Sequence, residues 1–144
     1  MKTHLAIAFV VACIQFANLP VQGCSCLPPP PPKKALEGSA AVFSGKVTEV
    51  KIVDQTKHVT IEVDRVWKGK VGEKVVVTTA VHSATCGFNF TTKGDATYLV
   101  YCYETKAGLA TNICTRTTTL AAGAADIKEL GEGEKVKKEE KAKE

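Results

Sequence analysis

Short segments in the middle of the chain alternate apolar and polar residues, which is the pattern of β-strands that bury one face. The alternation is strict at Val59, Ile61 and Val63, and it slips at Arg65, where we expect a β-bulge. Gly45 interrupts a long run rich in β-branched residues and predicts a second bulge or bend. The same signals predict strands at 41–53, 59–66, 75–79, 98–103 and 109–115.

Five short strands without intervening helices predict a mainly β fold, either an antiparallel sheet or a small five-stranded barrel. Closure into a barrel would remove the exposed edges. After the strands, residues 120–130 carry Leu120, Ala124, Ile127 and Leu130 at helical spacing. We therefore expect one short C-terminal helix packed on the barrel and ended by Gly131.

The first 23 residues have the pattern of a cleaved signal peptide: Lys2, an apolar run from 5 to 12 that weakens toward 19, Pro20, and compact residues before Cys24. The run is shorter than the roughly 20 residues of a spanning helix, so we expect no membrane span and a secreted protein. A second interpretation is that Val21-Gln22-Gly23-Cys24 is a bacterial lipobox, which would lipidate Cys24. Gln22 fits that pattern poorly.

Cleavage after Gly23 leaves 121 residues, enough for one domain, which we assign to 24–130. The proline run at 28–32 predicts a stiff, extended polyproline segment. Ten of the 14 residues at 131–144 are charged, five glutamates and five lysines, which predicts a disordered tail.

Composition excludes several functions. Removing Lys2 lowers the net charge from +4 to +3, and there is no basic stripe with interleaved aromatic residues, so a nucleic-acid partner is not expected. The chain has no nucleophile elbow, phosphate loop or H-E-x-x-H motif, so we expect neither an enzyme nor a bound cofactor.

Five cysteines remain after cleavage, at positions 24, 26, 86, 102 and 114. In an oxidising compartment two disulfides and one leftover thiol are expected, with the pairing left open by spacing alone. Alternation puts Cys102 on one face with Tyr98 and Val100, which indicates a buried thiol; a bridge between two chains is the alternative. A zinc site using these thiols with His58 or His82 lacks the paired C-x-x-C spacing.

Two further positions carry chemistry. If cleavage follows Gly23, Cys24 offers a free α-amine, a carbonyl and a thiol within one residue. Asn89-Phe90-Thr91 is an N-glycosylation sequon in an expected loop. We interpret His82 as an exposed loop residue and not as a protease contact. We interpret Trp67 as a core or rim residue and not as a platform for a ligand.

The order of several short motifs resembles the netrin-like module of the tissue inhibitors of metalloproteinases. They are Cys24-Ser25-Cys26, Ala41-Val42-Phe43-Ser44-Gly45-Lys46-Val47, Val66-Trp67-Lys68-Gly69, Ser83-Ala84-Thr85-Cys86-Gly87, Tyr98-Leu99-Val100 and Thr111-Asn112-Ile113-Cys114. The resemblance implies a barrel of the oligonucleotide/oligosaccharide-binding type. It also implies bridges from Cys24 to Cys86 and from Cys26 to Cys114.

The resemblance further implies a secreted inhibitor of zinc metalloproteases. The amine and carbonyl of Cys24 would chelate the zinc of the target enzyme. Ser25 would enter the primary specificity pocket, and a contact ridge would be completed by Cys26, Leu27, Ser83, Ala84 and Thr85.

The chain departs from that family in three ways. A third disulfide, expected between the neighbourhood of Glu37 and the terminal helix, is missing; so is the second, cysteine-rich domain; and Cys102 has no counterpart. The alternative function is a non-inhibitory extracellular netrin-like module that binds matrix, a glycan or another protein.

Overall fold

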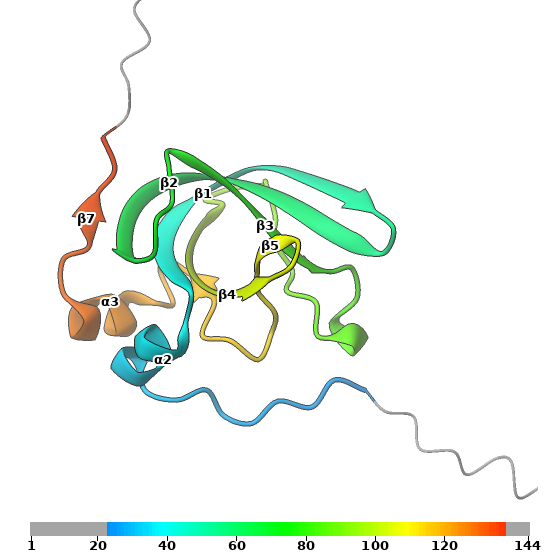
Figure 1. Ribbon diagram of the computed structural model, residues 1–144, viewed down its shortest axis with the longest axis horizontal. Coiled ribbons are helices and arrows are strands. Elements are labelled where there is room, and N and C mark those ends of the chain that lie inside the picture. Colours follow the sequence, from blue (N-terminus) through cyan, green and yellow to red (C-terminus); the bar gives the residue numbers. More distant parts are fainter. Residues whose placement is uncertain (1–22, 138–144) are drawn as a thin grey trace, which may run out of the picture.

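The computed structural model describes residues 23–137 (Figure 1). The predicted signal peptide, apart from Gly23, and the alternative lipobox before Cys24 lie outside the described residues, as does the end of the predicted tail from 138 to 144. Among the described residues, no helix is long and apolar enough to cross a membrane.

The described part of the chain is mainly β, with five strands hydrogen-bonded in a closed ring. The order around the ring is β1, β2, β3, β5 and β4, and β4 pairs back with β1. All these pairs are antiparallel except β3 with β5. The strands are β1 Ala41–Val53, β2 Thr56–Lys68, β3 Lys74–Ala80, β4 Thr97–Thr105 and β5 Gly108–Ala110, with two-residue additions at β6 Thr118–Thr119 and β7 Glu134–Lys135.

Strand β1 closes the ring because it bends and pairs on both sides. Its register with β2 shifts three times, and one shift falls between Ser44 and Gly45, where Asp64 becomes the extra residue of β2. The bulge predicted at Arg65 therefore lies one residue earlier. Gly45 faces the backbone of β2 so closely that an added Cβ would collide with the Glu62 carbonyl oxygen. The bend predicted at Gly45 coincides with this register shift.

Residues 98–102 of strand β4 are buried on both faces, because they lie between two apolar clusters. Tyr98, Val100 and Cys102 face the core inside the ring, together with Phe43 and Ile61. Residues on the opposite face pack against the helices: Leu99 and Tyr101 of β4, with Val42, contact Leu36, Trp67, Leu120, Ile127 and Leu130. Cys102 is a buried free thiol, as the alternation predicted.

Two short helices cover the second cluster and lie next to each other (Figure 1). Helix α3 spans Ala124–Leu130 and ends at Gly131, which confirms the C-terminal helix and its stop, but it begins four residues later than Leu120, since residues 120–123 form a turn. Helix α2 spans Pro32–Gly38 and was not predicted. The proline run is extended only as far as Pro31, because a proline fits the first turn of a helix, where its missing N–H has no intrahelical partner.

The predicted fifth strand is much shorter than expected: β5 ends at Ala110, and residues 111–117 form a loop instead of continuing to Thr115. In this loop, side-chain hydrogen bonds take the place of the backbone hydrogen bonds that a strand would make. The Thr111 hydroxyl bonds those of Thr115 and Thr117 at 2.9 and 2.7 Å, and the Asn112 side chain accepts the N–H of Cys114. Threonines that look like strand residues in the sequence thus satisfy the polar groups of a compact loop.

The tail is ordered further than predicted. Arg65 and Val66 pair with Lys135 and Glu134 of β7, and the N–H of Val136 donates to Asp64 at 2.9 Å. The Trp67 indole N–H also donates to the Gly131 carbonyl at 2.8 Å. Backbone pairing with β2 therefore holds a segment whose composition alone predicts disorder.

We predict that Gly45→Ala destabilises the fold, because its Cβ would meet the Glu62 backbone and lie 2.7 Å from Cγ2 of Ile61. Overpacking of this kind lowers the free energy of unfolding by roughly 1–3 kcal/mol, measured by urea denaturation. Gly72→Ala is the matched control, since nothing lies within 4 Å of that Cβ. Equal losses in the two variants would contradict the close approach.

Candidate functional site

The chain from Gly23 to Pro31 runs extended along the surface before entering α2, and all of it is exposed except the half-buried Cys24. Figure 1 shows its start at the same end of the molecule as the turn η2, Ser83–Thr85. The end of the β1–β2 hairpin is near as well, since the N–H of Val81 donates to Gln55 at 3.2 Å. Three segments far apart in the sequence meet here.

Two disulfides fasten this extended segment. Cys24 is bridged to Cys86, with Cα atoms 5.2 Å apart, and Cys26 to Cys114, with Cα atoms 5.1 Å apart. These are the pairs that the resemblance implies. The bridges are adjacent, because the sulfur atoms of Cys24 and Cys114 are 3.8 Å apart.

The turn that receives Cys24 is internally fixed. The His82 carbonyl accepts from the N–H of Thr85 at 3.0 Å, from the Thr85 hydroxyl at 2.9 Å and from the N–H of Gly87 at 2.9 Å. Gly87 is buried so close to the Ala80 carbonyl that no side chain would fit. The exposed side chains of Ser83, Ala84 and Thr85 therefore stand on a rigid base.

The backbone nitrogen of Cys24 lies against this turn. Its N–H donates to the Ala84 carbonyl at 3.0 Å. No hydrogen bond of the described residues uses the Cys24 carbonyl oxygen. The backbone nitrogen of Cys24 is thus held in position, while its carbonyl oxygen has no hydrogen-bond partner among the described residues.

The ridge, which we define as residues 24–27 together with Ser83–Thr85, brings together every contact residue predicted from the resemblance. Leu27 is 87% exposed, more than any other large hydrophobic residue among residues 23–137. Sequence reasoning missed Ile113, which is 39% exposed and bonds the Cys86 carbonyl through its N–H at 3.0 Å. The sequence pattern places Ile113 in the strand predicted at 109–115, and no local signal marks it as part of a surface loop beside the ridge.

A polar network lies behind the proline segment. Arg116 donates to both carboxylate oxygens of Asp126, from Nε at 2.8 Å and from Nη2 at 2.6 Å. Its remaining nitrogen, Nη1, donates to the Pro30 carbonyl at 2.9 Å. Asp126 is only 8% exposed and also accepts the Tyr101 hydroxyl at 3.3 Å. The network joins the N-terminal segment, α3 and β4.

Two pKa values shift because of burial. Burial, reinforced by the charge of Asp126, raises the pKa of Tyr101 to about 12, although Arg116 opposes the shift. Burial also raises the pKa of Cys102 to about 12. The Cys102 thiol therefore stays protonated at neutral pH, and a thiol in that form is a poor nucleophile.

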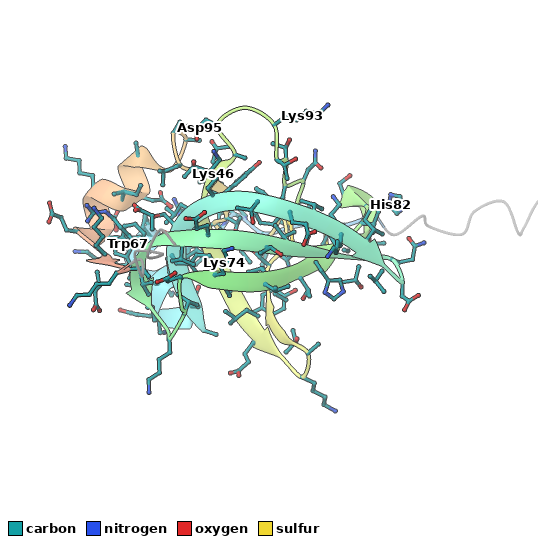
Figure 2. The ribbon with its side chains drawn as sticks, turned by 90° about the horizontal axis from the view of Figure 1, so that it is seen from above. Lys46, Trp67, Lys74, His82, Lys93 and Asp95 are labelled. Atoms are coloured by element: carbon teal, nitrogen blue, oxygen red, sulfur yellow. A yellow bond between two sulfur atoms is a disulfide. The ribbon has the colours of Figure 1, made fainter. Side chains whose placement is uncertain are left out.

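The clustered cysteines of the candidate site offer no thiolate that could bind a metal ion to this protein. Within residues 23–137, the grouped ligand atoms are the sulfurs of Cys24, Cys26 and Cys114, which lie within 4.8 Å of one another. All three are in disulfides, whereas zinc binds deprotonated thiolates. His82 is exposed on the turn, at the end of the molecule opposite Trp67 (Figure 2).

Asn89 is exposed, while the next residue of its sequon, Phe90, is buried against Phe88 and Tyr98. The side-chain oxygen of Asn89 is 3.5 Å from the Lys57 amine. Asn89 is thus exposed at the surface, as an N-glycosylation site requires.

A scan against models of known protein families found no match to this chain. A search of curated proteins found none either. The residues and their geometry therefore carry the functional argument.

We predict that the Tyr101 network makes stability fall at alkaline pH. Between pH 10 and 12 a tyrosine of the unfolded chain loses its proton while native Tyr101 keeps it, so the native state binds more protons and unfolding becomes easier as pH rises. From pH 9 to 11 this linkage costs about 1 kcal/mol, and Tyr101→Phe should lack that component. Urea denaturation at pH 9 and at pH 11 measures this loss of stability. An equal loss between the two pH values in Tyr101→Phe and in the native chain would contradict the prediction.

Proposed function

We propose that this chain is a secreted, single-domain inhibitor of zinc metalloproteases, built on a netrin-like barrel of the oligonucleotide/oligosaccharide-binding type. The closed order of β1, β2, β3, β5 and β4 supports that fold assignment. The observation that carries the function is the tethered backbone of Cys24, whose nitrogen is held against Ala84 beside an open carbonyl oxygen.

The proposed chemistry depends on cleavage after Gly23, which turns the Cys24 nitrogen into an α-amine. An uncharged amine has two N–H bonds and one lone pair. The contact with Ala84 uses one N–H and leaves the lone pair for a metal. Nitrogen and carbonyl oxygen of one residue then close a five-membered chelate ring on the zinc of the target.

Chelation inhibits because a catalytic zinc normally holds the water that attacks the substrate. An amine and a carbonyl occupying that position displace the water. An ordinary α-amine has a pKa of about 7.7–8.0, so a proton competes only mildly with the metal at neutral pH. Inhibition by chelation requires no catalytic residue in this chain and no cofactor.

The ridge supplies the remaining contacts in this proposal. Ser25 enters the primary specificity pocket, and Leu27 and Ser83–Thr85 fill the flanking subsites. The two bridges and the hydrogen-bonded turn hold these residues before binding, which reduces the conformational entropy lost on docking. An exposed Leu27 also gains burial only when a partner covers it.

We predict that one extra alanine ahead of Cys24 abolishes inhibition. It converts the amine into an amide, which lacks a basic lone pair, so the inhibition constant should rise at least roughly a hundredfold because a metal ligand is worth several kcal/mol. Both forms are purified with defined first residues and titrated against a panel of zinc proteases.

The matched control carries the extra alanine after Glu144 and should inhibit like the native form. Mass spectrometry establishes that all forms contain two disulfides. Equal inhibition by the amine and amide forms would falsify chelation. Inhibition by none of them would favour the alternative, a netrin-like module that binds matrix, a glycan or another protein.

A further inference from the structure

We infer that Arg116 is a positioning residue for the ridge: by holding the Pro30 carbonyl, it sets the direction in which Leu27 is presented to a partner. This inference rests on the proposed function, and it deepens that proposal by naming a determinant of specificity that lies outside the ridge.

The first step is the way the segment is held on either side of Leu27. The Cys26–Cys114 bridge fixes the residue before it. The next fixed point along the chain is the Pro30 carbonyl, bonded by Arg116 at 2.9 Å. Among the described residues, no other hydrogen bond is made by residues 27–30. The backbone path at Leu27 therefore depends on these two attachments.

Packing alone does not replace this hydrogen bond. Residues 28–31 are exposed, and an open cleft of about 200 Å³ runs beneath Pro29 and Pro30, with Tyr103 and Cys114 in its lining. Prolines stiffen the segment but cannot donate hydrogen bonds to the surface beneath them. Without the Arg116 bond the segment would be held only at its two ends, by the Cys26 bridge and by the Pro31 carbonyl, which accepts the Ala35 N–H of α2 at 2.9 Å, and the path between these points would be free to shift.

Arg116 itself is well fixed. Its guanidinium forms a two-point pair with Asp126, which lies on α3 and also bonds Tyr101 of the core strand β4. Its backbone follows Thr115, whose hydroxyl bonds those of Thr111 and Thr117. A planar group with several donors in fixed directions is needed to bind a carboxylate on two sides and a carbonyl on a third.

The test substitutes Arg116→Lys and combines it with Leu27→Ala. A lysine keeps a cation against Asp126, but its point-like ammonium does not reproduce the fork that also reaches Pro30. We expect Arg116→Lys to raise the inhibition constant roughly three- to tenfold, the cost of ordering one freed side chain on binding. In the Leu27→Ala background the same change should have almost no effect, because the residue it orients is gone.

Arg65→Lys is the matched control, since Arg65 is the chain's only other arginine and holds the Gly133 carbonyl at 3.3 Å in the other terminal segment. It should leave the inhibition constant unchanged in both backgrounds. A penalty from Arg116→Lys that persists in full with Leu27→Ala would show a general structural role and overturn the inference.

A second measurement does not need a protease. The Leu27 methyl order parameter, from nuclear magnetic resonance relaxation, should fall in Arg116→Lys and stay at the native value in Arg65→Lys. An unchanged value in Arg116→Lys would overturn the inference even if the native chain inhibits proteases. A fall without inhibition by any form would support the positioning role and count against the proposed function.

Discussion

The covalent attachment of an otherwise weakly held N-terminal segment is the constraint on which the rest of the candidate site depends. Residues 24–31 bury little surface, and their prolines donate no hydrogen bonds. The bridges close loops with sequence separations of 62 and 88 residues, worth roughly 4–5 kcal/mol each in the chain-entropy model. That contribution is realised only if the ring presents Cys86 and Cys114 side by side, so the fold and the ridge stabilise each other.

The ring can present them because β4 links every layer of the structure. One face of β4 fills the interior through Val100, and the other packs Tyr101 under the helices. The Tyr101 carbonyl also accepts the Thr111 hydroxyl at 2.9 Å, which ties the loop carrying Cys114 to the most buried strand. The position of the second bridge is therefore set by the core and not by the surface loop alone.

The sequence predicted the features that depend on local periodicity. The alternation at Val59, Ile61 and Val63 identified β2 because one face of that strand is buried, and apolar residues at helical spacing identified α3. It did not reveal features that depend on distant partners. Strand β7 forms because β2 offers it backbone groups, which a run of lysines and glutamates does not indicate. Arg116 looks like an ordinary loop charge until the fold brings Pro30, 86 residues away, beside it.

The contact between Arg116, Asp126 and Pro30 connects the N-terminal segment to α3 without a disulfide. Arg116 forms an ion pair with Asp126 of α3, and its Nη1 donates to the Pro30 carbonyl of the N-terminal segment. The pair is held in place because its side chains are only 21% and 11% exposed and because Asp126 has a third partner in Tyr101. A surface ion pair contributes little, whereas a shielded one with its polar atoms satisfied resists separation, since breaking it leaves a buried charge alone. The ion pair therefore keeps Arg116 in place to hold the Pro30 carbonyl.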